Sequence, residues 1–321
     1  MSDKALIHAV YLRDGVDTGR HAVVEEGRID EPIWLHFNVS QPNARAELKK
    51  AAPYIDDAMV DALCAEDTRP RVEEFEKEYL VILRGINLNP EEDPEDMVSL
   101  RIWSDGSHVV SAQRRSVFAA RKLAAKLQAA DQPASSSEVI VGLTVNIIEN
   151  MAVPISELME EIDELELEMI DGGKPEHRTK LANLRHKVLL LRRYFNPLRA
   201  AVGLLKDLAT TWLGEKYTRR LRNAHDDLTR HLEDLDAARD RLQFQQEELV
   251  TIMSDRLNRN MYTLSIVAAI FLPLGFITGL FGINVGGMPG VDDGTAFWVV
   301  TGGCGAIAVV LAFFFRRSGW F

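Results

Sequence analysis

The spacing of hydrophobic residues changes twice along the chain. Up to about residue 112, apolar residues come in short runs rich in β-branched and aromatic side chains, which is typical of strands in a folded sheet. The runs that predict strands are Ala5–Val10, Ile33–Phe37, Arg71–Phe75, Tyr79–Leu83, Val98–Trp103 and His108–Ala112. Helical spacing occurs at Asn43–Leu63 and Val117–Ala129. Residues 1–135 therefore predict an α/β domain in which helices pack on a sheet.

After residue 135 the pattern becomes helical. One helix is predicted from about Ser137 to Ile170, ending at the glycine pair 172–173, and a second from about Pro175 to Leu213 with a bend at Pro197. Together they should form an antiparallel hairpin over residues 136–214. The first of the two carries a dense acidic set: Glu157, Glu160, Glu161, Asp163, Glu164, Glu166, Glu168 and Asp171. A solvated helix face and an attraction for cations both account for this charge.

A third helical run begins near Glu215 and contains no Gly or Pro before Pro273. If it continues to Phe281 it has about 67 residues, on the order of 100 Å at 1.5 Å per residue. A pattern of this length predicts a stalk helix at 215–260 that continues into a membrane span. Its acidic residues stand at helical spacing from arginines, so ion pairs within the helix are expected. The acids are Asp226, Asp227, Glu233, Asp234, Asp236 and Asp240, and the arginines are Arg219, Arg220, Arg222, Arg230, Arg239 and Arg241.

Two uncharged stretches near the carboxyl end are long enough to cross a membrane. Residues 261–281 and 297–315 carry no charged side chain, and about 20 apolar residues span a bilayer core. Arg256 and Arg259 precede the first stretch and a basic tail, 316–321, follows the second. The positive-inside rule therefore predicts an external loop at 282–296 and two cytoplasmic termini. With no apolar signal region at its start, the chain is expected to be a multi-pass inner-membrane protein.

Composition supports this division and excludes several functions. The 321-residue chain has 37 Lys and Arg against 48 Asp and Glu, a net charge of -11, which argues against a nucleic-acid partner. Cys64 and Cys304 form neither a disulfide framework nor a zinc motif. The sequence contains no Walker A motif, nucleophile elbow or dinucleotide loop. We therefore expect no enzymatic activity and no resident cofactor.

The first span is interrupted by small residues. Gly275 and Gly279 lie four residues apart and so share one face of a helix, while Pro273 and Gly282 stand nearby. Small residues let helices approach closely in lipid, where apolar burial cannot drive association. Two spans per chain cannot enclose a conduction path. A pore would therefore require several copies.

The segment Ile270–Asn284, IFLPLGFITGLFGIN, resembles the first transmembrane helix and the Gly-x-Asn signature of the CorA superfamily. Its position supports the resemblance, because it ends the first of two C-terminal spans. Arg69–Phe75 and Tyr79–Arg84 also resemble cytoplasmic strands of that family. The resemblance implies a divalent-cation transporter with a funnel-shaped cytoplasmic domain. It further implies a homopentamer in the lipid bilayer, with a pore lined by the first span.

On this resemblance, Gly282, Ile283 and Asn284 form the pore mouth, where five Asn284 amides would make a neutral oxygen ring suited to a hydrated dication. Following the helical period back, the positions that would line the pore are Gly279, Gly275, Leu272, Ala268, Leu264 and Met261. Met261 and Leu264 could form a hydrophobic constriction or simply pack on neighbouring helices. The entrance loop would present Met288, Pro289, Asp292 and Asp293. The span holds no carboxylate or histidine for a proton relay.

The identity of the cargo depends on the residues around this motif. Ile283, the glycine-rich run 286–290 and the segment 192–199 resemble the ZntB zinc-transport branch, whereas the magnesium branch commonly has Gly-Met-Asn. Zn²⁺ is therefore the expected cargo, moved inward by an ion or proton gradient, and Mg²⁺, Co²⁺, Ni²⁺ and Cd²⁺ are alternatives. Zinc favours imidazole ligands, and the candidates, assembled between subunits, are His177, His186, His225 and His231. A membrane-anchored sensor or scaffold is the alternative from another class.

Overall fold

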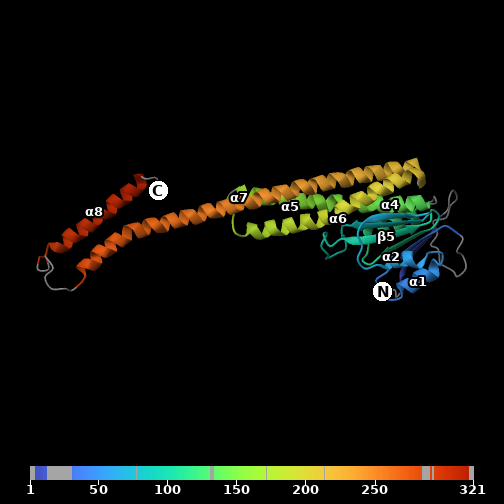
Figure 1. The fold of residues 1–321 in the computed structure, drawn as a ribbon, viewed down its shortest axis with the longest axis horizontal. Helices are drawn as coiled ribbons and strands as arrows, with labels where there is room; N and C mark the ends of the chain where they lie inside the picture. The colour runs from blue at the N-terminus through green and yellow to red at the C-terminus, as the bar shows by residue number, and fades with distance from the viewer. Residues whose placement is uncertain are drawn as a thin grey trace. The chain divides into compact units, whose positions relative to one another are not determined.

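The computed structural model describes residues 4–12, 31–76, 78–130, 134–170, 172–212, 214–283, 290 and 293–317. The chain divides into two compact units, Met1–Gln245 and Gln246–Phe321, and each unit is described by itself. Figure 1 colours the elements of both units by residue number. The finer division of the helical part into hairpin, stalk and spans stays a prediction.

The first unit contains a six-stranded sheet, which lies between α2 and α4 in Figure 1. Its order is β1-β2-β6-β5-β4-β3, and the β2–β6 pair is parallel while the other neighbours are antiparallel. The strands are β1 (Leu6–Tyr11), β2 (Ile33–Asn38), β3 (Arg71–Phe75), β4 (Glu78–Gly85), β5 (Val98–Ser104) and β6 (Val109–Gln113). All six strands predicted from the β-branched and aromatic runs are confirmed, and no end is shifted by more than two residues.

Helices cover both faces of the sheet. Helices α1 (Ala44–Ala51) and α2 (Asp57–Cys64) pack against β1, β2, β5 and β6. Leu35 and Phe37 belong to the hydrophobic core beneath them, and because side chains alternate along a strand, Trp34 and His36 point to the opposite face. Helices α3 (Phe118–Gln128) and α4 (Ser136–Glu149) pack together, and α4 contacts β2, β4 and β6. The helix predicted at Val117–Ala129 is thus confirmed.

Two predicted helices are each broken in the structure. The helical stretch predicted at residues 43–63 is two helices, because Pro53 cannot continue α1, and Asp56 caps α2 by accepting a 2.6 Å hydrogen bond from Met59 N. The helix predicted at 137–170 is also two, α4 and α5 (Ala152–Ile170). Pro154 lies in the first turn of α5, where its missing N–H is tolerated. Apolar periodicity continued across both breaks and concealed them.

Two long helices follow, and the second of them begins in the first unit and continues into the second. Helix α6 (His177–Trp212) contains Pro197, and α7 (Glu215–Phe281) has 67 residues and contains Pro273. Both were predicted with nearly these bounds. In the first unit, the buried side of α7 keeps three- and four-residue spacing. Its buried apolar residues are Leu221, Ala224, Leu228, Leu232, Leu235, Ala238 and Leu242.

A small polar network is buried in the sheet. Ser111 Oγ accepts a 2.8 Å hydrogen bond from Trp34 Nε1 and lies 2.7 Å from His36 Nδ1. The His36 ring also stacks on His8, which lies opposite it on β1, with centroids 5.9 Å apart. Burial lowers the pKa of His36 from 6.5 to about 4. This imidazole is therefore neutral at physiological pH.

The free energy of unfolding should fall as the pH is lowered from about 6.5 to about 4, because His36 takes up a proton more readily in the unfolded chain. The full loss from this group is on the order of 3 kcal/mol. We expect His36→Gln to reduce the pH dependence of the melting temperature over this interval, measured by circular dichroism on the detergent-solubilised chain. His186→Gln, at an exposed position on α6, should keep the wild-type slope. Equal slopes for all three proteins would contradict the assignment to His36.

Candidate ion-conducting segment

Three stretches of the described chain are long and apolar enough to cross a membrane. They are Ser136–Ile170, which comprises α4 and α5, then α7, and α8 (Ala296–Arg317). The apolar window of the first stretch is 56% buried inside the protein, against 6% for α7 and 0% for α8. The apolar residues of α4 and α5 thus serve the core of the first unit. The apolar windows of α7 and α8, in contrast, are left almost uncovered by the described chain.

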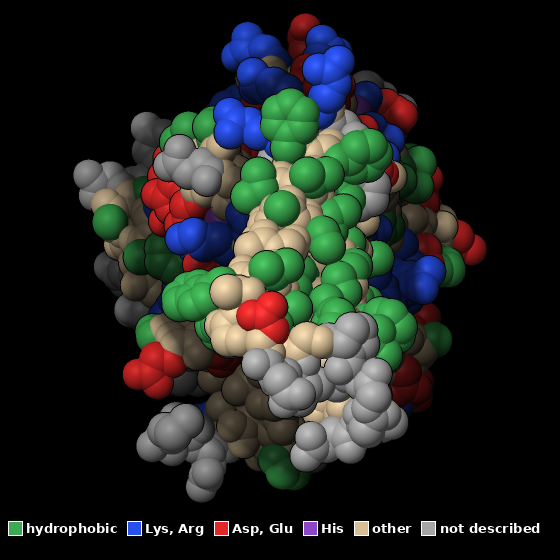
Figure 2. All heavy atoms as spheres, turned by 90° about the vertical axis from the view of Figure 1, so that its left-hand side faces the viewer, with side chains coloured by type: hydrophobic (Ala, Val, Ile, Leu, Met, Phe, Trp, Pro, Cys, Tyr) green, Lys and Arg blue, Asp and Glu red, His purple; other side chains and the backbone are tan. Residues whose placement is uncertain are grey.

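The second unit has almost no interior of its own. Leu249 and Ile266 are the two buried hydrophobic residues among its described residues, whereas most of the large apolar side chains that α7 and α8 contribute to this unit are exposed. Figure 2 shows such side chains, in green, gathered over the helices that face the viewer. An apolar surface of this kind marks contact with a membrane or with other protein. The surface therefore fits the two spans predicted from the uncharged stretches.

One side of α7 is more exposed than the other. At about 100° per residue, the six helix positions predicted to line a pore fall within a sector of roughly 80°. Met261, Leu264, Leu272, Gly275 and Gly279 are all exposed, and Ala268 is half-buried. The less exposed residues lie on roughly the opposite side: Ile266, Ile270, Leu274 and Ile277. The predicted lining residues thus occupy the side that this chain leaves uncovered.

The glycines of this side have no neighbours inside the chain. A Cβ added at Gly275 or Gly279 would meet no atom within 4 Å. At Gly282 the added atom would lie 3.2 Å from Thr278 O, because Gly282 N donates to Thr278 O at 2.9 Å as the helix ends. Packing within one chain therefore does not explain why residues 275 and 279 are small.

The outer end of the segment is described only in part. Ile283 is exposed, while Asn284, Met288, Pro289 and Asp292 lie outside the described residues. Asp293 accepts hydrogen bonds from Thr295 N at 2.9 Å and from its hydroxyl at 2.8 Å, and they lower the pKa of this carboxyl. Asp293 therefore anchors the turn before α8, where its carboxylate is exposed at the predicted entrance.

The four candidate histidines have separate surroundings. His177 is buried, and its Nδ1 accepts a hydrogen bond from Lys174 N at 3.3 Å. His225 lies against Gly203 of α6, His186 is exposed, and burial lowers the pKa of His231. Across the described ranges, no group of three or more His, Cys, Asp and Glu side chains could hold a metal ion. The chain does not bring these histidines together, and ligation between subunits stays a prediction.

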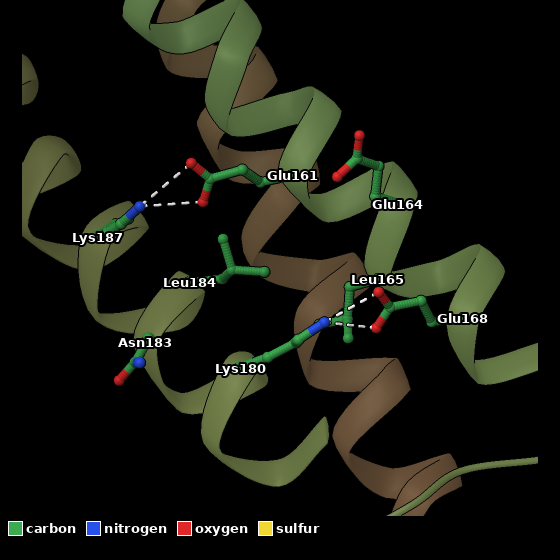
Figure 3. Close-up of a pocket in the computed structure, with 8 residues that line it drawn as sticks. All are labelled: Glu161, Glu164, Leu165, Glu168, Lys180, Asn183, Leu184 and Lys187. Atoms are coloured by element: carbon green, nitrogen blue, oxygen red, sulfur yellow. Dashed lines mark hydrogen bonds and ion pairs between the residues drawn. The ribbon is translucent and has the colours of Figure 1, made fainter. Parts of the chain in front are cut away.

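The acidic helix α5 is partly neutralised by lysines of α6. Glu161 pairs with Lys187 at 3.0 Å and Glu168 with Lys180 at 2.7 Å, on either side of a groove of about 320 Å³ (Figure 3). From the first pair to the second, the residue number increases along α5 and decreases along α6, because the two helices are antiparallel. Lys180 lowers the pKa of Glu168 through its hydrogen bonds. Glu161 and Glu168 are therefore engaged in ion pairs between α5 and α6.

Ion pairs of the stalk helix extend beyond the helix itself. Arg230 pairs with Asp227 at the predicted helical spacing of three residues, whereas Arg239 pairs with its sequence neighbour Asp240. Asp236, however, pairs with Arg192 of α6. Arg241 binds Glu166 and Asp163 of α5, with Nε donating to Glu166 at 2.9 Å, and these hydrogen bonds raise the pKa of its guanidinium. Periodicity along one helix could not reveal pairs that form between helices.

An α/β unit continued by one long helix into apolar helices of membrane-spanning length defines an integral membrane protein. Comparison with known proteins shows to which family of membrane proteins the chain belongs. The family described as CorA-like Mg²⁺ transporter protein matches residues 30–317, and the chain belongs to this family.

Relatives of known name cover nearly the whole chain. The divalent cation transporter CmaX of Pseudomonas aeruginosa is 36% identical over 294 residues, which are 91% of this chain and 88% of CmaX. The zinc transport protein ZntB of Pectobacterium carotovorum is 32% identical over 294 residues, with the same coverage of 91% and 88%.

Solved structures agree with the fold. The structure of full-length CmaX has a TM-score of 0.80 and 33% identity over 99% of this chain and 98% of that one. The CorA magnesium transporter from Methanocaldococcus jannaschii has a TM-score of 0.79 at 20% identity and covers 100% of both chains, which shows likeness of fold alone.

Proposed function

We propose that this chain transports divalent cations, Zn²⁺ in particular, across the inner membrane through a pore that five copies build around α7. The observation that carries the proposal is the uncovered side of α7, where Leu264, Gly275 and Gly279 are exposed and the two glycines have no neighbour within 4 Å. A single pair of spans encloses nothing. Copies that meet around this side would line a path with it.

The uncovered side begins before the span. Val250, Met253 and Leu257 are exposed apolar residues that continue toward Met261 at three- and four-residue spacing. Apolar residues at this spacing pack between parallel helices. A bundle of α7 copies would therefore bury them, and the same bundle would carry the pore through the membrane.

The residues of this path suit a dication that keeps its water. At the outer end, amide oxygens of Asn284 would hold the hydrated ion without a full charge, since Mg²⁺ and similar ions dehydrate reluctantly. Gly275 and Gly279 would leave room for the hydration shell. Met261 and Leu264 would form a hydrophobic constriction that closes by excluding water. No carboxylate or histidine lies among residues 261–281 to hold the ion on its way.

The membrane supplies both orientation and driving force. Arg256, Arg259, Arg316 and Arg317 flank the two apolar helices and favour cytoplasmic placement of both termini. A membrane potential contributes about 2.3 kcal/mol per elementary charge per 100 mV, and therefore about twice that for a dication. An interior-negative potential thus favours inward transport.

Zinc is favoured over magnesium by the relatives named zinc transport protein and by the entrance-loop sequence. The test is flux into proteoliposomes that contain the purified full-length chain and a Zn²⁺ or Mg²⁺ indicator. We expect Zn²⁺ entry that depends on protein and increases with an interior-negative potential. Entry of Mg²⁺ without Zn²⁺ would instead support the Mg²⁺ and Co²⁺ alternative, and the absence of flux for every dication would support a sensor or scaffold.

A further inference from the structure

Three arginines gather at one end of the sheet in the first unit. Arg84 lies near the end of β4, Arg101 lies in β5, and Arg114 follows β6. Arg101 is opposite Ile82 on one side and Ala112 on the other, so Arg84 and Arg114 are its diagonal neighbours. Side chains two residues apart share a face, which places all three on the face covered by α1 and α2. Arg101 is fully buried there.

Part of this charge is used to hold the segment that follows α2. Arg84 Nη2 donates to Thr68 O at 2.9 Å, Arg101 Nη2 to Ala65 O at 2.6 Å, and Arg114 Nη2 to Cys64 O at 3.4 Å. Cys64 is the last residue of α2, and cations near a helix C-terminus stabilise its free carbonyl groups. A structural role therefore accounts for all three nitrogens of Arg84, whose Nε and Nη1 also donate to Thr68 O and Met97 O, but for only one nitrogen each of Arg101 and Arg114.

Other donors at the same place remain unmatched. Among the described residues, Arg101 Nε and Nη1, Arg114 Nε and the Thr68 hydroxyl are buried and have no hydrogen-bond partner. A buried charged group whose donors lack partners lowers the stability of the fold unless a counterion binds to it. Burial, together with repulsion from Arg114 and Arg84, lowers the pKa of Arg101 to about 10. The cluster thus has an excess of positive charge and of donors.

Two acidic residues near the cluster partly balance its positive charge, but their side chains lie at the surface. Glu66 lies 3.2 Å from Arg114 Nη2 and Asp67 lies 3.6 Å from Arg84 Nη2, yet both carboxylate side chains are almost fully exposed. Exposed pairs of this kind contribute little stability. Glu66 and Asp67 can therefore move away and leave the arginines to another anion.

We propose that Arg101, Arg114 and Thr68 bind a phosphate group beneath the segment 64–68. A guanidinium presents paired N–H donors that match two oxygens of a phosphate, and charge-assisted hydrogen bonds of this type are strong. The Thr68 hydroxyl, which is buried without a partner in the segment that these arginines hold, supplies a further donor. Glu66, which pairs with Arg114 from outside, competes with the bound anion. Free phosphate and the phosphate of a nucleotide share this chemistry, and the site is independent of the pore.

The experiment measures the melting temperature of the purified full-length chain in detergent, in metal-free buffer, with inorganic phosphate or with chloride at equal ionic strength. At about ten times the dissociation constant, phosphate should raise the melting temperature by about 3 °C over chloride. Arg114→Gln should weaken phosphate binding by about tenfold or more, whereas Glu66→Gln should strengthen it. Arg45→Gln, which changes an exposed arginine of α1 paired with Asp61, should behave as wild type.

Two results would overturn the proposal: no phosphate-specific shift in the wild-type chain, or equal shifts in wild type, Arg114→Gln and Glu66→Gln. Glu66 is exposed, so Glu66→Gln gives a readable result even if the arginine variant unfolds. A parallel titration with ATP identifies the source. A shift with phosphate alone supports free phosphate as the ligand, and a tighter shift with ATP supports a nucleotide phosphate.

Discussion

Replacing Gly279 with valine should greatly reduce cation flux and leave the melting temperature of the chain unchanged. An added Cβ at Gly279 meets no atom within 4 Å, so the larger side chain causes no clash inside one copy. If five copies meet with this side inward, however, five valines fill the path or separate the helices. We expect the initial rate of Zn²⁺ entry into proteoliposomes to fall by about tenfold or more.

A matched control for this substitution is available on the other apolar helix. Gly302 of α8 also has no atom within 4 Å of an added Cβ, but α8 does not line the proposed pore. Gly302→Val should therefore transport cations at close to the wild-type rate. Wild-type flux through Gly279→Val, or an equal loss in both variants, would argue against a path lined by the exposed side of α7.

The second large effect is expected at the pore mouth. Asn284→Ala replaces the proposed ring of amide oxygens by methyl groups, which cannot bind the water of a hydrated dication. The rate of Zn²⁺ entry should fall by about tenfold or more, measured in the same proteoliposomes at equal protein content. Ile283→Leu keeps the apolar character of the neighbouring position and should retain transport. A sensor or scaffold would instead function normally with Asn284→Ala.

The fold was largely predictable because its signals are local. Runs such as Tyr79–Leu83 and Val98–Trp103 have the composition of buried strands, and the structure confirms both as central strands. The breaks near Pro53 and Pro154 were missed because apolar residues keep helical spacing on both sides of each proline. The order of the strands in the sheet could not be predicted, because no local feature of the sequence indicates that β2 pairs in parallel with β6.

The candidate site remains a prediction. The helical period alone selects the side of α7 that contains Leu264 and Gly275, and both residues are exposed in the described chain. Pairing of Arg241 with Glu166 and the gathering of Arg101 with Arg114 depend on contacts between distant segments. No spacing rule along one helix or strand reports such contacts. The role of Asn284 still rests on the resemblance of its motif.

The continuity of α7 also bears on how the protein is made. Leu228, Leu235 and Leu242 of this helix are buried parts of the first unit, yet they are synthesised after every strand of the sheet and only shortly before the first apolar span at 261. The last residues of the core of the first unit are therefore made just before the ribosome produces the apolar span that begins at residue 261. Folding of the first unit is therefore completed at about the time at which the first span is delivered to the membrane.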